Sequence, residues 1–69
     1  MPIYMAPRDQ EMVIIKITGN DKQKTRLQTM GFVEGETITV VHCMDENVIV
    51  KIKGVSVAIG KDLAKRILV

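Results

Sequence analysis

The residue types best suited to metal chemistry lie within one short stretch of the chain. They are His42, Cys43, Asp45 and Glu46. Successive side chains of a β-strand point to opposite faces, so His42 and Cys43 cannot both reach one ion if this stretch is extended. The chain has no other histidine or cysteine, whereas a structural zinc usually takes four nitrogen or sulfur ligands. We therefore expect no cofactor and no dedicated metal site, and these four residues remain only weak metal-binding candidates.

The sequence also lacks the patterns that enzymes and nucleic-acid readers use. It has no glycine-rich phosphate loop and no nucleophile beside a plausible base. Its two aromatic residues, Tyr4 and Phe32, are too few to line a groove for proline-rich peptides or to stack bases. A net charge of +2, from ten Lys plus Arg against eight Asp plus Glu, does not demand a polyanionic partner. We expect a non-enzymatic protein with no catalytic residues and no nucleic-acid partner.

Length and composition predict one small domain over residues 1–69. Apolar residues make up 46% of the chain, which is enough to form a core. No apolar run approaches the roughly 18–20 residues of a membrane span, and the first residues show no secretory signal pattern. The single cysteine excludes an internal disulfide and is typical of a reducing compartment. We expect a cytoplasmic protein that does not insert directly into a membrane.

Hydrophobic periodicity predicts five strands and one helix. Residues 1–10 are expected to form an irregular N-terminal arm. The predicted strands are 12–17, 36–43, 48–53, 55–59 and 67–69. The helix should begin after Asn20, in a capping box with Gln23, and run to about Met30, and one further helical turn is expected over 63–66. Closing such short strands into a barrel removes exposed edges, so the predicted fold is a mostly β five-stranded barrel with one helix between its first two strands.

The most specific pattern runs from Arg26 to Val40. The helix should end at Gly31, where the left-handed conformation favours glycine, and Gly35 should take a turn position with positive φ. An alternation with a period of two then begins at Thr37. This stretch, R-L-x-x-M-G-F-x-x-G-x-x-I-x-V, resembles the FeoA family of ferrous iron transport A proteins. The resemblance extends from about residue 10 to the C-terminus.

Further positions support the resemblance. The residues that match the family's motifs are Leu27, Met30, Gly31, Gly35, Gly54, Ala64, Ile67 and Val69. The chain departs from the family at Gly60, where a basic residue is usual, and at Leu63, where Glu is frequent. The resemblance implies an SH3-like barrel that docks onto the cytosolic domain of the ferrous iron transporter FeoB. Two alternatives remain: a metal-responsive regulatory module like the barrel of iron-dependent repressors, and a small RNA-associated barrel.

Two regions are candidates for contact with a partner. The outer side of the predicted helix carries Lys24 and Gln28, with Arg26 flanking it. It leads into Phe32, which is either an apolar anchor for the partner or a core residue. Four apolar residues alternate with the residues that should face inward on their strands, so they should face outward. They are Ile14, Val41, Ile49 and Leu68. They are either covered by the helix and the N-terminal arm, or they form an exposed patch for a partner or a second copy. The pattern leaves both alternatives open and does not specify the oligomeric state.

Overall fold

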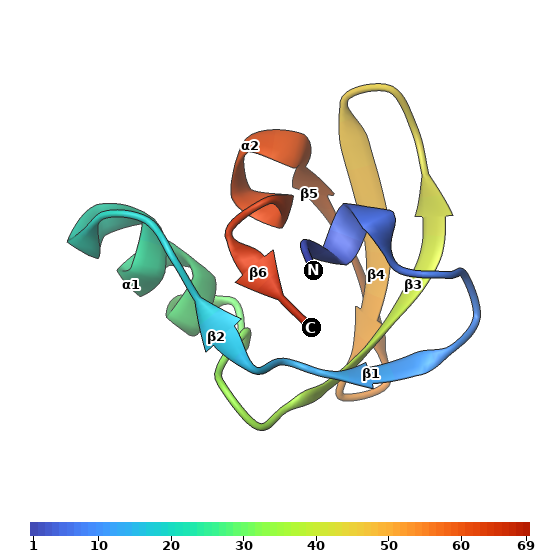
Figure 1. Ribbon diagram of the computed structural model, residues 1–69, viewed down its shortest axis with the longest axis horizontal. Helices are drawn as coiled ribbons and strands as arrows, with labels where there is room; N and C mark the ends of the chain where they lie inside the picture. Colours follow the sequence, from blue (N-terminus) through green and yellow to red (C-terminus); the bar gives the residue numbers. More distant parts are fainter.

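The computed structural model describes residues 1–69 and is mostly β, with two short α-helices (Figure 1). Its elements in chain order are η1 (Ile3–Met5, a 3-10 helix), β1 (Glu11–Val13), β2 (Lys16–Ile17), α1 (Asp21–Thr29), β3 (Thr37–Cys43), β4 (Asn47–Ile52), β5 (Val55–Gly60), α2 (Lys61–Ala64) and β6 (Ile67–Leu68). One antiparallel sheet has the strand order β1-β3-β4-β5, and a second pairs β2 with β6. The predicted class, with a helix between early strands and a short helix before the last strand, is confirmed.

The strand predicted over 12–17 is broken into two strands, so the fold has six strands where the sequence predicted five. The N–H of Ile14 donates to the carbonyl of Glu36 at 2.9 Å, whereas the N–H of Ile15 donates to the carbonyl of Leu68 at 2.8 Å. The chain therefore leaves the four-stranded sheet and enters the two-stranded sheet between these two residues. The predicted outward phase of Ile14 was wrong, because Ile14 is buried and Ile15 is 62% exposed.

The N-terminal segment is built into the fold more closely than an irregular arm would be. Ile3 has no exposed surface and Ala6 is buried, so both belong to the core. The amino group of Met1 donates to the carbonyl of Val69 at 2.9 Å, and the N–H of Val69 donates back to the carbonyl of Met1 at 2.8 Å. The two ends of the chain consequently lie side by side (Figure 1).

One core of 14 buried residues, all of them apolar, holds the elements together. The central strands β3 and β4 supply alternate residues: Ile38, Val40, Val48, Val50 and Ile52. Leu27 from α1, Phe32 from the following loop and Ile67 from β6 also belong to this core. The predicted apolar stripe of the helix is confirmed, since Leu27 has no exposed surface and Met30 packs against the core.

The local signals at both ends of α1 are those that the sequence predicts. The side-chain oxygen of Asn20 accepts from the N–H of Gln23 at 2.8 Å, and the side-chain oxygen of Gln23 accepts from the N–H of Asn20 at 3.0 Å. Beyond the other end, Gly31 has a φ of +97° and Gly35 a φ of +88°, both in the region that favours glycine. These conformations direct the chain from α1 into β3.

The last helical turn begins earlier than predicted. Gly60 pairs with Asn47 as the final residue of β5, so the strand runs directly into α2 without the expected break. The N–H of Lys61 donates to the carbonyl of Glu46 at 3.0 Å, which ties the start of α2 to the turn between β3 and β4. The helical turn therefore covers Lys61–Ala64 and not 63–66. Neither α-helix has the length and apolar character that a membrane crossing requires.

Candidate functional site

The four weak metal candidates lie at and beside the turn between β3 and β4, and all of them are exposed: His42, Cys43, Asp45 and Glu46. A register shift in β3 makes Val41 the extra residue of a bulge. His42 pairs with Ile49 and Cys43 pairs with Val48, so the two side chains start from opposite faces of the strand. The structure contains no group of three or more His, Cys, Asp or Glu side chains that could hold a metal ion.

The four predicted docking residues do not form one surface. Phe32 has no exposed surface, so it is a core residue and not an apolar anchor for a partner. Successive residues are separated by about 100° around a helix axis, so Lys24 and Arg26 lie on nearly opposite edges of α1. Lys24 is half-buried and lies one turn before the exposed Gln28, whereas Arg26 is exposed on the other edge. One docked protein would therefore contact either the edge with Lys24 and Gln28 or the edge with Arg26.

The edge of α1 that carries Arg26 faces α2 across a cleft of about 360 Å³, which we call the α1–α2 cleft. Its lining residues are Lys22, Gln23, Arg26, Gly60, Asp62 and Leu63. Leu63 is half-buried against the core and supplies an apolar wall, while Lys22 and Arg26 are exposed cations. Arginine is enriched among the residues that dominate the binding energy of protein contacts. Sequence reasoning found Arg26 but not this cleft, because only the fold places α2 across from α1.

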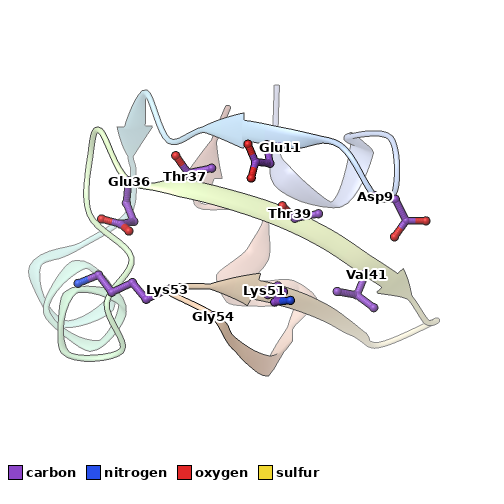
Figure 2. Close-up of a pocket in the computed structure, with 9 residues that line it drawn as sticks. All are labelled: Asp9, Glu11, Glu36, Thr37, Thr39, Val41, Lys51, Lys53 and Gly54. Atoms are coloured by element: carbon purple, nitrogen blue, oxygen red, sulfur yellow. The ribbon is translucent and has the colours of Figure 1, made fainter.

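A second hollow lies on the outer face of the four-stranded sheet, and we call it the outer groove (Figure 2). It has a volume of about 570 Å³ and is lined by Asp9, Glu11, Glu36, Thr37, Thr39, Val41, Lys51, Lys53 and Gly54. Figure 2 shows Glu11 on the β1 side of β3 and Lys51 and Lys53 on its β4 side. Small threonine side chains between these longer charged ones leave the surface hollow.

Strand register aligns the charges of the outer groove. Glu11 pairs with Thr39 and Thr39 pairs with Lys51, so the three residues form one row across β1, β3 and β4. Neighbouring strands lie about 4.8 Å apart, so the backbones of Glu11 and Lys51 are separated by about 10 Å. Sequence reasoning missed the groove, although the alternation of Lys51 and Lys53 on one strand face was a signal. Only the strand register shows that Lys51 lies across β3 from Glu11.

Solved structures define the class of this protein. The iron uptake regulatory protein FeoA is 29% identical and superimposes with a TM-score of 0.88, covering 97% of this chain and 91% of that one. The FeoA of Stenotrophomonas maltophilia, an SH3 domain protein solved in complex with zinc, is 26% identical with a TM-score of 0.82, covering 99% and 87% of the two chains. The predicted SH3-like fold is therefore confirmed. A manganese-dependent transcriptional repressor is 13% identical and shares the fold alone. It superimposes with a TM-score of 0.88, and the match covers 97% of this chain and 39% of the repressor chain.

The family follows from two further comparisons. The model of the FeoA domain matches residues 1–69. A Fe(2+) transport protein A of Methanocaldococcus jannaschii is 32% identical over 68 residues, which cover 99% of this chain and 83% of that relative. The chain belongs to the FeoA family, over its whole length and not only from about residue 10. Membership of this family implies an accessory role in ferrous iron transport.

Proposed function

We propose that this protein assists ferrous iron uptake by docking onto the cytosolic domain of the membrane transporter FeoB. The observation that carries the proposal is the match of the FeoA domain to residues 1–69. The name of the relative from Methanocaldococcus jannaschii, which refers to Fe(2+) transport, supports the same process. The protein would act in the cytoplasm, as a binding partner without chemistry of its own.

We further propose that the α1–α2 cleft is the docking surface. Its two exposed cations, Lys22 and Arg26, lie one turn apart on the same edge of α1. Leu63 offers an apolar contact on the opposite wall. The other edge of α1, with Lys24 and Gln28, is the rival surface within the set that the sequence predicted.

The experiment is a binding measurement with the purified cytosolic domain of FeoB, preceded by a pull-down from membranes with this protein as bait. Charge reversal at the cleft, Lys22→Glu with Arg26→Glu, should weaken binding at least about tenfold, mainly by slowing association. The matched control is Lys16→Glu with Lys65→Glu, which makes the same change in net charge at two other exposed positions. Both variants should melt within about 0.5 kcal/mol of the wild type, as ordinary surface changes do.

Each part of the proposal has its own contradicting result. Failure of the wild-type protein to bind the cytosolic domain would overturn docking onto FeoB. Binding that survives reversal at Lys22 and Arg26 but is lost in Lys24→Glu with Gln28→Glu would move the surface to the other edge of α1. Equal loss in the Lys16 and Lys65 control would mean that binding responds only to overall charge.

A metal-responsive regulatory module is the second candidate function, favoured by the fold shared with the manganese-dependent repressor. It requires tight and stoichiometric binding of ferrous iron by this chain, which anaerobic calorimetry would measure. The docking proposal requires no such binding. The remaining alternative, an RNA-associated barrel, would be supported by RNA binding that weakens steeply with salt.

A further inference from the structure

The outer groove has a charge pattern that complements itself. Its β1 side is acidic, with Glu11, and its β4 side is basic, with Lys51, while the threonines of β3 lie between them (Figure 2). We propose that two copies of this chain associate face to face through the outer groove, related by a two-fold axis that runs parallel to β3. The partner is thus a second copy of the same chain, and the proposal is independent of docking onto FeoB.

Strand register determines how the charges would meet. Because Glu11, Thr39 and Lys51 share one row across three strands, they have the same position along the strand direction. A half-turn about an axis parallel to β3 keeps that position and exchanges the two sides of the groove. Glu11 of each copy then lies over Lys51 of the other, and two equivalent ion pairs form in an isologous interface.

The charge pattern also excludes the competing arrangement. A two-fold axis perpendicular to the strands, still in the plane of the interface, would place β1 over β1 and β4 over β4. Glu11 would then face Glu11, and Lys51 would face Lys51, which is unfavourable because like charges in an interface repel. Both axes leave the strands of the two sheets aligned, as packed sheets usually are, so it is the charge pattern that favours the axis parallel to β3.

The residues nearest the proposed axis are compatible with self-contact. Glu36 also lines the groove, but it precedes β3 and its side chain points toward the β4 side (Figure 2), which leaves Thr37, Thr39 and Val41, all on β3, along the axis. A residue on a two-fold axis meets its own counterpart, so these positions must be uncharged. Val41 is the one hydrophobic residue that lines the groove, and it is 37% exposed. In a face-to-face pair the two copies of Val41 would lie close together and lose contact with water.

The size of the molecule sets the expected strength of this association. The principal extents are 29, 25 and 21 Å, so even the largest face covers only about 700 Å². A stable protein interface typically buries about 800 Å² on each partner. The pair should therefore be weak, with a dissociation constant in the micromolar to millimolar range, and it should depend on salt because its contacts are largely ionic.

The first test uses the wild-type protein alone, in sedimentation equilibrium over a wide range of concentration. A monomer–dimer equilibrium is expected at about 50 mM salt, and its dissociation constant should rise at least about tenfold at about 500 mM salt. A protein that stays monomeric at millimolar concentration and low salt overturns the proposal. A dimer whose affinity does not change with salt overturns it as well.

The second test exchanges the two charges. Glu11→Lys and Lys51→Glu should each remove self-association, because each variant places like charges against each other twice. An equal mixture of the two variants should form a heterodimer, and a chain with both substitutions should recover the homodimer, since both arrangements restore two opposite-charge pairs. This recovery also shows that the single variants are folded, and urea melts provide an independent check.

The controls match the charge changes at positions outside the groove. Lys65→Glu changes the net charge as Lys51→Glu does, and Glu34→Lys changes it as Glu11→Lys does, and both wild-type residues are exposed. Both controls should dimerise like the wild type. Loss of dimer in the controls, or failure of folded single variants to associate when mixed, would rule out the proposed pairing. Dimers that persist in both groove variants would place any interface elsewhere.

Discussion

The two faces of the four-stranded sheet share one backbone but differ in what their residues do. On the inner face Ile38 is fully buried and belongs to the core, while its neighbour Thr39 lines the outer groove. In the same way Val50 is fully buried and Lys51 is exposed. Burying an aliphatic side chain contributes about 1.5–3 kcal/mol to stability, whereas a typical exposed position contributes little. Alternate residues of one strand therefore separate folding from recognition, and substitutions can test the two independently.

The largest expected effect on stability is at the loop between α1 and β3, where a buried and an exposed residue are again neighbours. Phe32 has no exposed surface, whereas Val33, the next residue, is 38% exposed. We predict that Phe32→Ala lowers the free energy of unfolding by about 3–5 kcal/mol, since it removes a large core side chain and leaves a cavity. Val33→Ala should cost less than about 1 kcal/mol. Urea melts of both variants decide the matter, and equal midpoints would contradict the assignment of Phe32 to the core.

The next effect concerns backbone conformation and not burial. An added Cβ would meet no atom within 4 Å at Gly31 or at Gly35, so only the positive φ resists a substitution. We predict that Gly31→Val and Gly35→Val each cost about 1–3 kcal/mol, because a β-branched residue is strained there. Gly31→Asn should cost clearly less, since asparagine tolerates this region. Melts that rank Asn and Val equally at position 31 would contradict a conformational origin.

These positions also show which parts of the fold the sequence could predict. Local rules were sufficient at α1, because the capping box of Asn20 and Gln23 and the stop at Gly31 depend only on nearby residues. They failed at Ile14, which is buried where the chain changes sheets: the backbone of Ile14 bonds to Glu36 and that of Ile15 to Leu68, residues far along the chain. A continuous β-branched run does not show where one strand passes from one sheet to another.

The candidate sites were less predictable than the fold, for a related reason. Arg26 could be recognised as an exposed cation, but its partner wall, Leu63, comes from α2 at the other end of the chain. The row formed by Glu11, Thr39 and Lys51 depends on the registers of two strand pairs. The bulge at Val41 shifts that register in β3, and no local pattern predicts such an extra residue.

A smaller effect on stability, and a stabilising one, is expected at the turn between β4 and β5, at the rim of the outer groove. Lys53 and Gly54 form the two-residue turn between β4 and β5, with φ values of +52° and +79°. Asparagine followed by glycine is the preferred pair in such a turn, whereas lysine is disfavoured at positive φ. We predict that Lys53→Asn stabilises the fold by about 0.5–1 kcal/mol. The control Lys51→Asn removes the same charge from a regular strand position and should give no gain in the same thermal melts.

The smallest expected effect is at the turn between β3 and β4, where every residue from His42 to Asn47 is exposed. Because His42 and Cys43 start from opposite faces of the strand and both are exposed, we predict that metal contributes nothing to folding. A melt of the untagged protein should be unchanged within about 0.5 kcal/mol by a chelator, and so should a melt of His42→Ala with Cys43→Ser. Elemental analysis of the same preparation provides the second measurement. One firmly held zinc or iron per chain, lost together with stability when the chelator is added, would contradict the prediction. It would also show that a site can be assembled at this exposed turn from side chains that start on opposite faces of the strand.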